Sequence, residues 1–85
     1  MTRDHVLWHL REAAEELAGT IAELDGDPEY SAAELSVAMT HLYHHLNTAW
    51  NARDASGEEI TLCSHSDFVK WRQFPTDIDL TARDD

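Results

Sequence analysis

One stretch of this sequence, from Leu35 to Ala52, contains no Asp, Glu, Lys or Arg, although charged residues make up 27% of the chain. About five charges would be expected in a window of that length. A helix with one wet face carries its charges on that face, so an uncharged helix is most simply explained by burial on more than one side. We therefore expect a helix here that is surrounded by protein.

The chain is short, so we expect a second copy of it to cover part of this helix. The 85 residues are expected to form a single helical domain over 1–85, and a monomer of this size hides only about 60 to 65% of its unfolded surface. An apolar content of 42% excludes a disordered chain. Association would enlarge a thin core.

The first helix is predicted over residues 4–24. Its apolar residues recur at steps of three and four, which is the heptad pattern of a helix that packs against a neighbour: Leu7, Leu10, Ala14, Leu17, Ile21 and Leu24. Asp25-Gly26-Asp27-Pro28 then ends the helix, because proline cannot continue the hydrogen-bond ladder.

The second helix is predicted over residues 31–53, where Ser31 and Glu34 have the spacing of a capping box. The connection between the helices is short, which favours an antiparallel hairpin. We expect the apolar stripe of this helix to pack along that of the first; it comprises Leu35, Met39, Leu42, Leu46, Ala49 and Arg53.

The C-terminal third is predicted to contain one short helix over 66–73 and an extended tail over 74–85. Between them and the hairpin, residues 56–63 carry mixed signals, with capping spacing before a partly β-branched run, and are interpreted as a short helical turn or an irregular segment. Phe68, Trp71 and Phe74 are expected to form an aromatic anchor, which either covers the hairpin or inserts into a neighbouring chain.

The charge balance limits the partners. The net charge is −11, from 17 acids against 6 scattered bases, so we expect no nucleic-acid binding and no contact with anionic membranes. The acidity favours solubility, a basic protein partner, or mimicry of nucleic acid towards such a partner. Cys63 is the single cysteine, and the sequence shows neither a signal peptide nor a membrane span. A cytoplasmic location is expected.

The six histidines are the main chemical feature of the sequence. His5 and His9 are spaced i, i+4, as are His41 and His45, and the hairpin brings the two pairs to one end. His9, His41 and His45 are therefore candidate ligands for zinc or another transition metal. The heptad, however, points His5, His9, His41 and His44 outward and leaves only His45 at the interface. Packing at a core edge, or a pH-sensitive interface, is the competing interpretation.

Two other patterns are given no catalytic role. Cys63-Ser64-His65-Ser66-Asp67 contains a nucleophile, a base and an acid, but adjacent residues do not supply the geometry of a nucleophilic site, and helix capping explains the serines. Glu12 and Glu16 are i, i+4 on a solvated face. We expect no catalytic residues.

The sequence thus predicts an all-α fold: a long antiparallel two-helix hairpin, a short C-terminal helix and an extended tail, completed to a four-helix bundle by dimerisation. The predicted function is that of a homodimeric interaction module; the alternative is a histidine-liganded transition-metal-binding protein, with or without enzymatic activity. The predicted interface consists of Met39, Tyr43, Leu46, Trp50, Phe68, Trp71 and Phe74.

Overall fold

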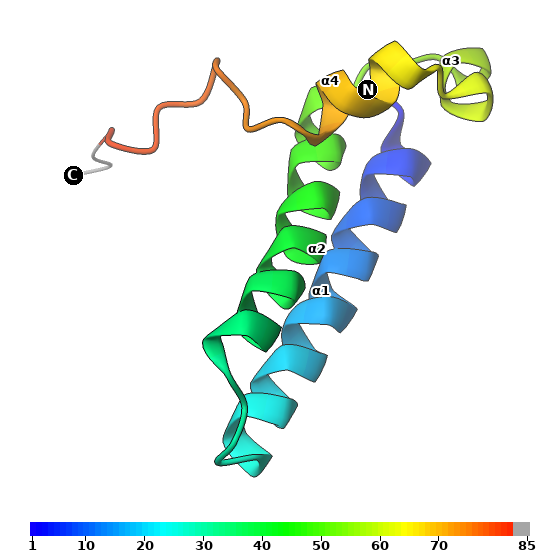
Figure 1. Cartoon of the computed structure of the whole chain (residues 1–85). Coiled ribbons are helices and arrows are strands. Elements are labelled where there is room, and N and C mark those ends of the chain that lie inside the picture. Colours follow the sequence, from blue (N-terminus) through cyan, green and yellow to red (C-terminus); the bar gives the residue numbers. More distant parts are fainter. Residues whose placement is uncertain (83–85) are drawn as a thin grey trace.

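The computed structural model describes residues 1–82, which form four helices and no strand: α1 (Arg3–Gly26), α2 (Ala32–Asn51), α3 (Gly57–Leu62) and α4 (His65–Arg72). The long helices α1 and α2 run antiparallel, α3 and α4 lie across the open end of this hairpin, and the chain after α4 extends away from it (Figure 1). The predicted all-α hairpin is confirmed. The last three residues of the predicted tail, 83–85, lie outside the described residues.

Serine caps set where three of the helices begin. The Ser31 hydroxyl accepts from the backbone N–H of Glu34 at 3.2 Å, and the Glu34 carboxylate accepts from the Ser31 N–H at 3.4 Å, as the capping box requires. Ser56 and Glu59 repeat the arrangement, which turns the segment of mixed signals into α3. Ser64 caps α4 by accepting from a backbone N–H at 3.1 Å.

The contact between α1 and α2 is made by small and polar side chains. His9 and Ala13 are the buried residues of α1, and Ala38, Asn47, Thr48 and Ala49 are those of α2. The predicted contact between the two apolar stripes is wrong for α1, whereas on α2 Ala49 of the predicted stripe is buried and Leu35, Met39 and Leu42 are half-buried. Alanines let the two helices approach closely, whereas most of the large apolar side chains of α1 are 40–59% exposed: Leu7, Leu10, Leu17, Ile21 and Leu24.

The helix α4 packs against the C-terminal half of α2, and its Trp71 is buried against the segment that follows α2. This side chain is 6% exposed and packs against Ala52, Ala55 and Ile60. Thr48, on the same side of α2, is 4% exposed. The uncharged stretch therefore does have protein over part of its surface, and the chain itself supplies it. Val37, in the first half of α2, is 60% exposed.

Two asparagines of α2 hold the end of α4 in place. The Asn47 side-chain amide donates to the backbone oxygen of Arg72 at 2.9 Å. Asn51 donates to the backbone oxygens of Trp71 at 3.0 Å and Gln73 at 2.7 Å. These bonds satisfy carbonyl groups that the end of a helix leaves without partners.

Within residues 1–82, no helix is long and apolar enough to cross a bilayer.

Candidate functional site: an apolar face and a histidine cluster

One side of the hairpin is an apolar face, which we define as Leu7, Leu10, Leu17, Ile21 and Leu24 of α1 with Met39 and Leu46 of α2. Leu10 follows the buried His9 by one residue and so lies about 100° around α1 from the contact with α2. Leu46 follows His45 in the same way. Because α1 and α2 are antiparallel, equal rotations bring both sets of side chains to the same side of the hairpin.

The apolar face is large and uncharged. Met39 is half-buried and Leu46 is 40% exposed, so the α2 part continues the exposed stripe of α1. The chain exposes 6516 Å², whereas a folded monomer of its mass is expected to expose about 5,100 Å². The excess is about 1,400 Å² by the same relation. The chain after α4, which extends away from the hairpin (Figure 1), contributes to this excess.

The other predicted interface residues of α2 meet the tail of their own chain. Tyr43 is 39% exposed and lies edge-on to Phe74, with 5.0 Å between ring centroids. The indole N–H of Trp50 donates to the Asp77 carboxylate at 2.8 Å. The tail and α2 enclose an open groove of about 230 Å³, lined by Tyr43, Leu46, Asn47, Trp50, Phe74, Pro75, Ile78 and Leu80.

The predicted aromatic anchor is divided between different surroundings. Trp71 is buried in its own chain and is therefore not available at a free surface. Phe68 is 41% exposed, with the Arg72 guanidinium 3.8 Å above its ring. Phe74, which is 61% exposed, packs on Tyr43 instead, because α4 ends at Arg72 and the chain turns before residue 74.

A histidine cluster forms where α1, α2 and α4 meet. His9, His44 and His45 each place one ring nitrogen within 4.8 Å of the other two. His9 and His45 share a hydrogen bond of 3.0 Å between their Nδ1 atoms. The outward orientation predicted for His9 is wrong, since His9 is only 6% exposed. The structure thus brings together two of the three predicted metal ligands.

His41, the third predicted ligand, lies outside the cluster, and His44 takes its place. His41 is exposed, with Nδ1 3.9 Å from a carboxylate oxygen of Glu16. His41 and His44 each lie one turn from another histidine of α2, so spacing alone does not show which of the two joins the cluster. The position of α4 decides, because Trp71 and Arg72 cover the end of α2 that holds His44.

Burial keeps His9 and His44 uncharged at neutral pH. Loss of hydration lowers the pKa of His9 to about 4, and repulsion from His5, His45, His44 and Arg72 adds to this. Loss of hydration, followed by the charge of Arg72, lowers the pKa of His44 to about 4. Burial also lowers the pKa of His5. The rings therefore carry lone pairs at pH 7.

The tautomer of His44 follows from its neighbours. Arg72 can only donate, and its Nη2 lies 3.4 Å from His44 Nε2, so Nε2 is the acceptor. The proton is then on Nδ1, which donates to the Thr48 hydroxyl at 3.3 Å. This bond fixes the orientation of the ring within the helix.

A cavity of about 190 Å³ opens beside the cluster, lined by His5, His9, His44, Thr48, Ile60, Cys63, Phe68, Trp71 and Arg72. The Nε2 atom of His5 is buried without a hydrogen-bond partner in the described part of the chain. Cys63 has a left-handed backbone, with φ of 40°, which is uncommon for a residue other than glycine.

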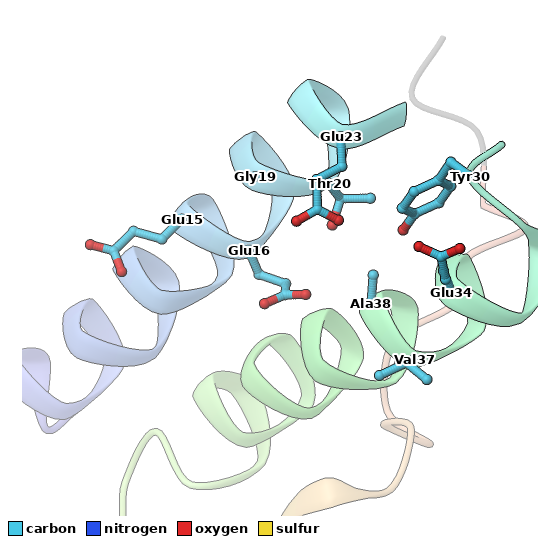
Figure 2. Close-up of a pocket in the computed structure, with 9 residues that line it drawn as sticks. All are labelled: Glu15, Glu16, Gly19, Thr20, Glu23, Tyr30, Glu34, Val37 and Ala38. Carbon is cyan, nitrogen blue, oxygen red and sulfur yellow. The ribbon is translucent and has the colours of Figure 1, made fainter. Parts of the chain in front are cut away.

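A second cleft, near the closed end of the hairpin, is acidic. It measures about 360 Å³, and none of the residues that line it is basic. Figure 2 shows the carboxylates of Glu16, Glu23 and Glu34 turned toward the space beside Tyr30. Loss of hydration and these carboxylates raise the pKa of the Tyr30 hydroxyl. Acidic side chains around an open cleft are common in acidic proteins, and we assign no function to it.

No family model matches the chain, and no curated protein or solved structure shows significant similarity to it. The arguments for function therefore rest on the apolar face and on the histidine cluster.

Proposed function

We propose that this protein is an interaction module that acts as a homodimer, in which the apolar faces of two hairpins meet and complete a four-helix bundle. The observation that carries this proposal is the exposed leucine stripe of α1, where Leu10, Leu17 and Ile21 are 43%, 47% and 59% exposed. Monomeric proteins rarely leave a contiguous apolar stripe of this length in water. The exposed free thiol of Cys63 fits a reducing compartment such as the cytosol.

A second copy fits the apolar face because two such faces can pack on each other about a twofold axis. With the axis parallel to the helices, α1 of one copy, which carries five of the seven residues of the face, lies against α2 of the other. An isologous interface requires this self-complementarity. The aliphatic character, with no charged residue among its members, also suits contact with an identical surface.

The area supports the same partner. A standard stable interface buries about 800 Å² per partner, and obligate homodimers bury more. The chain, with 6516 Å² exposed, has about 1,400 Å² more than a typical monomer of its mass. The hairpin can therefore supply a standard interface and still keep a normal exposed surface.

Charge opposes the association without preventing it. Each copy carries a net charge of −11, so two copies repel each other over the distance of a Debye length, which is about 8 Å at physiological ionic strength. Glu12, Glu15, Glu16 and Glu23 of α1 lie away from the apolar face, where salt screens them. The apolar contact must exceed this repulsion.

A pair of matched substitutions tests the proposal. Leu17→Asp places a charge in the middle of the apolar face, whereas Leu62→Asp places the same charge on α3, where the leucine is 74% exposed. By sedimentation velocity, we expect Leu17→Asp to be monomeric and Leu62→Asp to remain dimeric like the natural chain. If the two variants have the same assembly state as each other, the apolar face is not the interface.

A further inference from the structure

We propose that His9, His44 and His45 form a three-histidine site for a divalent transition metal of the zinc class, with the fourth coordination position open to the neighbouring cavity. This inference does not depend on dimerisation. Its ligands and the cavity lie under α4, whereas the apolar face belongs to side chains of α1 and α2 that point elsewhere.

The spacing of the ligands fits such an ion. Zinc binds imidazole nitrogen at about 2.0–2.1 Å, which places two ligands of a tetrahedral site about 3.3 Å apart. The Nδ1 atoms of His9 and His45 are 3.0 Å apart, and all three ring nitrogens lie within 4.8 Å of one another. His9 stands on α1, and His44 and His45 stand on α2, so two packed helices hold the three rings near one another.

The cluster needs little change of protonation to bind a metal. A metal takes neutral imidazole, and binding is weakened wherever a proton must first be removed. The lowered pKa values of His9 and His44 keep both rings neutral at pH 7. The proton shared between His9 and His45 moves to Nε2 when both Nδ1 atoms bind the ion, which is a change of tautomer and releases no proton.

His44 is already oriented for the role. Its Nδ1–H donates to the Thr48 hydroxyl at 3.3 Å, and a second hydrogen bond of this kind is what commonly fixes a metal-binding histidine. Its Nε2 lone pair then points to the ligand side, where Arg72 Nη2 now lies at 3.4 Å. Arg72 is exposed, so it can swing into solvent as the ion enters. It acts as a competitor for the site.

The cavity beside the cluster would leave the fourth coordination position of the ion open to solvent. Sites with three histidine ligands and a fourth ligand from solvent are typical of zinc that binds or activates small molecules. The cavity of about 190 Å³ has room for water and a small anion. The ring of His5 also lines this cavity.

Titration of the tag-free, metal-free protein with Co²⁺ and with Zn²⁺ tests the site. We expect one equivalent per chain and the intense visible absorption of tetrahedral Co²⁺, which Zn²⁺ displaces. His44→Gln should weaken binding by at least about tenfold, because even supporting residues of metal sites are worth that much. His41→Gln is the matched control on the same helix, and His65→Gln is a second one; both should leave the affinity unchanged.

Removal of Arg72, which competes with the ion, should raise the metal affinity. Arg72→Gln should bind Zn²⁺ more tightly than the natural chain, whereas a loss of affinity there would contradict the role given to Arg72. His45→Gln, checked for helix content by circular dichroism, guards against misfolding of a single variant. Absence of binding at stoichiometric metal, or an equal loss in His41→Gln and His44→Gln, would overturn the site. Leu17→Asp should keep the metal affinity of the natural chain even when it is monomeric, so a failure of the metal site can be told apart from a failure of the dimer.

Discussion

Acidification of the metal-free protein from pH 7 to pH 5 should destabilise the fold through His9. The pKa of this residue is about 4 in the folded chain, against 6.5 for an ordinary histidine. The unfolded chain therefore binds more protons between these values, and folding stability must fall as the pH drops through this window. Above pH 6.5 the contribution of His9 is fully present.

The size of the effect follows from the shift. One pKa unit corresponds to 1.36 kcal/mol, so protonation of His9 removes about 2 kcal/mol by pH 5 and about 3 kcal/mol by pH 4. His44 adds a smaller amount, because it is half-buried and water screens its charge. Relief of acid–acid repulsion acts in the opposite direction, since the net negative charge shrinks as the pH approaches the pI of about 4.7.

Urea unfolding at pH 7, 6 and 5, at one fixed chain concentration, measures this loss by tryptophan fluorescence. His9→Gln removes the titrating group and should flatten the dependence on pH. His41→Gln removes an exposed histidine and should leave the slope as it is. A free energy of unfolding that stays level or rises between pH 7 and pH 5, or an unchanged slope in His9→Gln, would refute the reasoning.

Other predictions concern the interface and the helix ends. Leu17→Ala should weaken the dimer about 30-fold in sedimentation equilibrium, because its 47% exposed side chain is worth about 1 kcal/mol in each of two copies; unchanged affinity would place Leu17 outside the interface. Added NaCl should tighten the dimer, since salt screens the repulsion between two acidic chains, whereas weakening by salt would show that ion pairs hold it. Ser31→Ala should cost about 1 kcal/mol in urea unfolding through loss of the cap, and no change would mean that the capping box contributes little. Asn51→Ala removes two hydrogen bonds to the end of α4 and should speed hydrogen exchange in α4 while that of α1 stays the same.

The helices and their starts were predictable because their causes are local. Ser31 with Glu34 and Ser56 with Glu59 satisfy backbone groups within one turn, so the sequence of four residues is enough to identify the cap. Pro28 and the short connection likewise dictate a hairpin without reference to the rest of the chain. The observed limits of α1 and α2 differ from the predicted ones by only one or two residues.

The packing was harder to predict because it depends on which neighbour each face meets. The heptad in α1 identifies an apolar face correctly, but the hairpin contact is made by the alanines and His9 beside it, so His9 is inside and Leu10 is outside. The choice of His44 over His41 depends on where α4 lies, and α4 is placed by hydrogen bonds from Asn47 and Asn51 to its last carbonyls. No spacing within α2 carries that information.

The central claim, that two hairpins cover each other's leucines, is tested most directly by the mass of the natural chain in solution. Sedimentation equilibrium of tag-free protein at micromolar concentration and physiological salt should give about 19 kDa, twice the chain mass of 9.7 kDa. A single species of 9.7 kDa across that concentration range would contradict the account and leave the apolar face without its proposed partner.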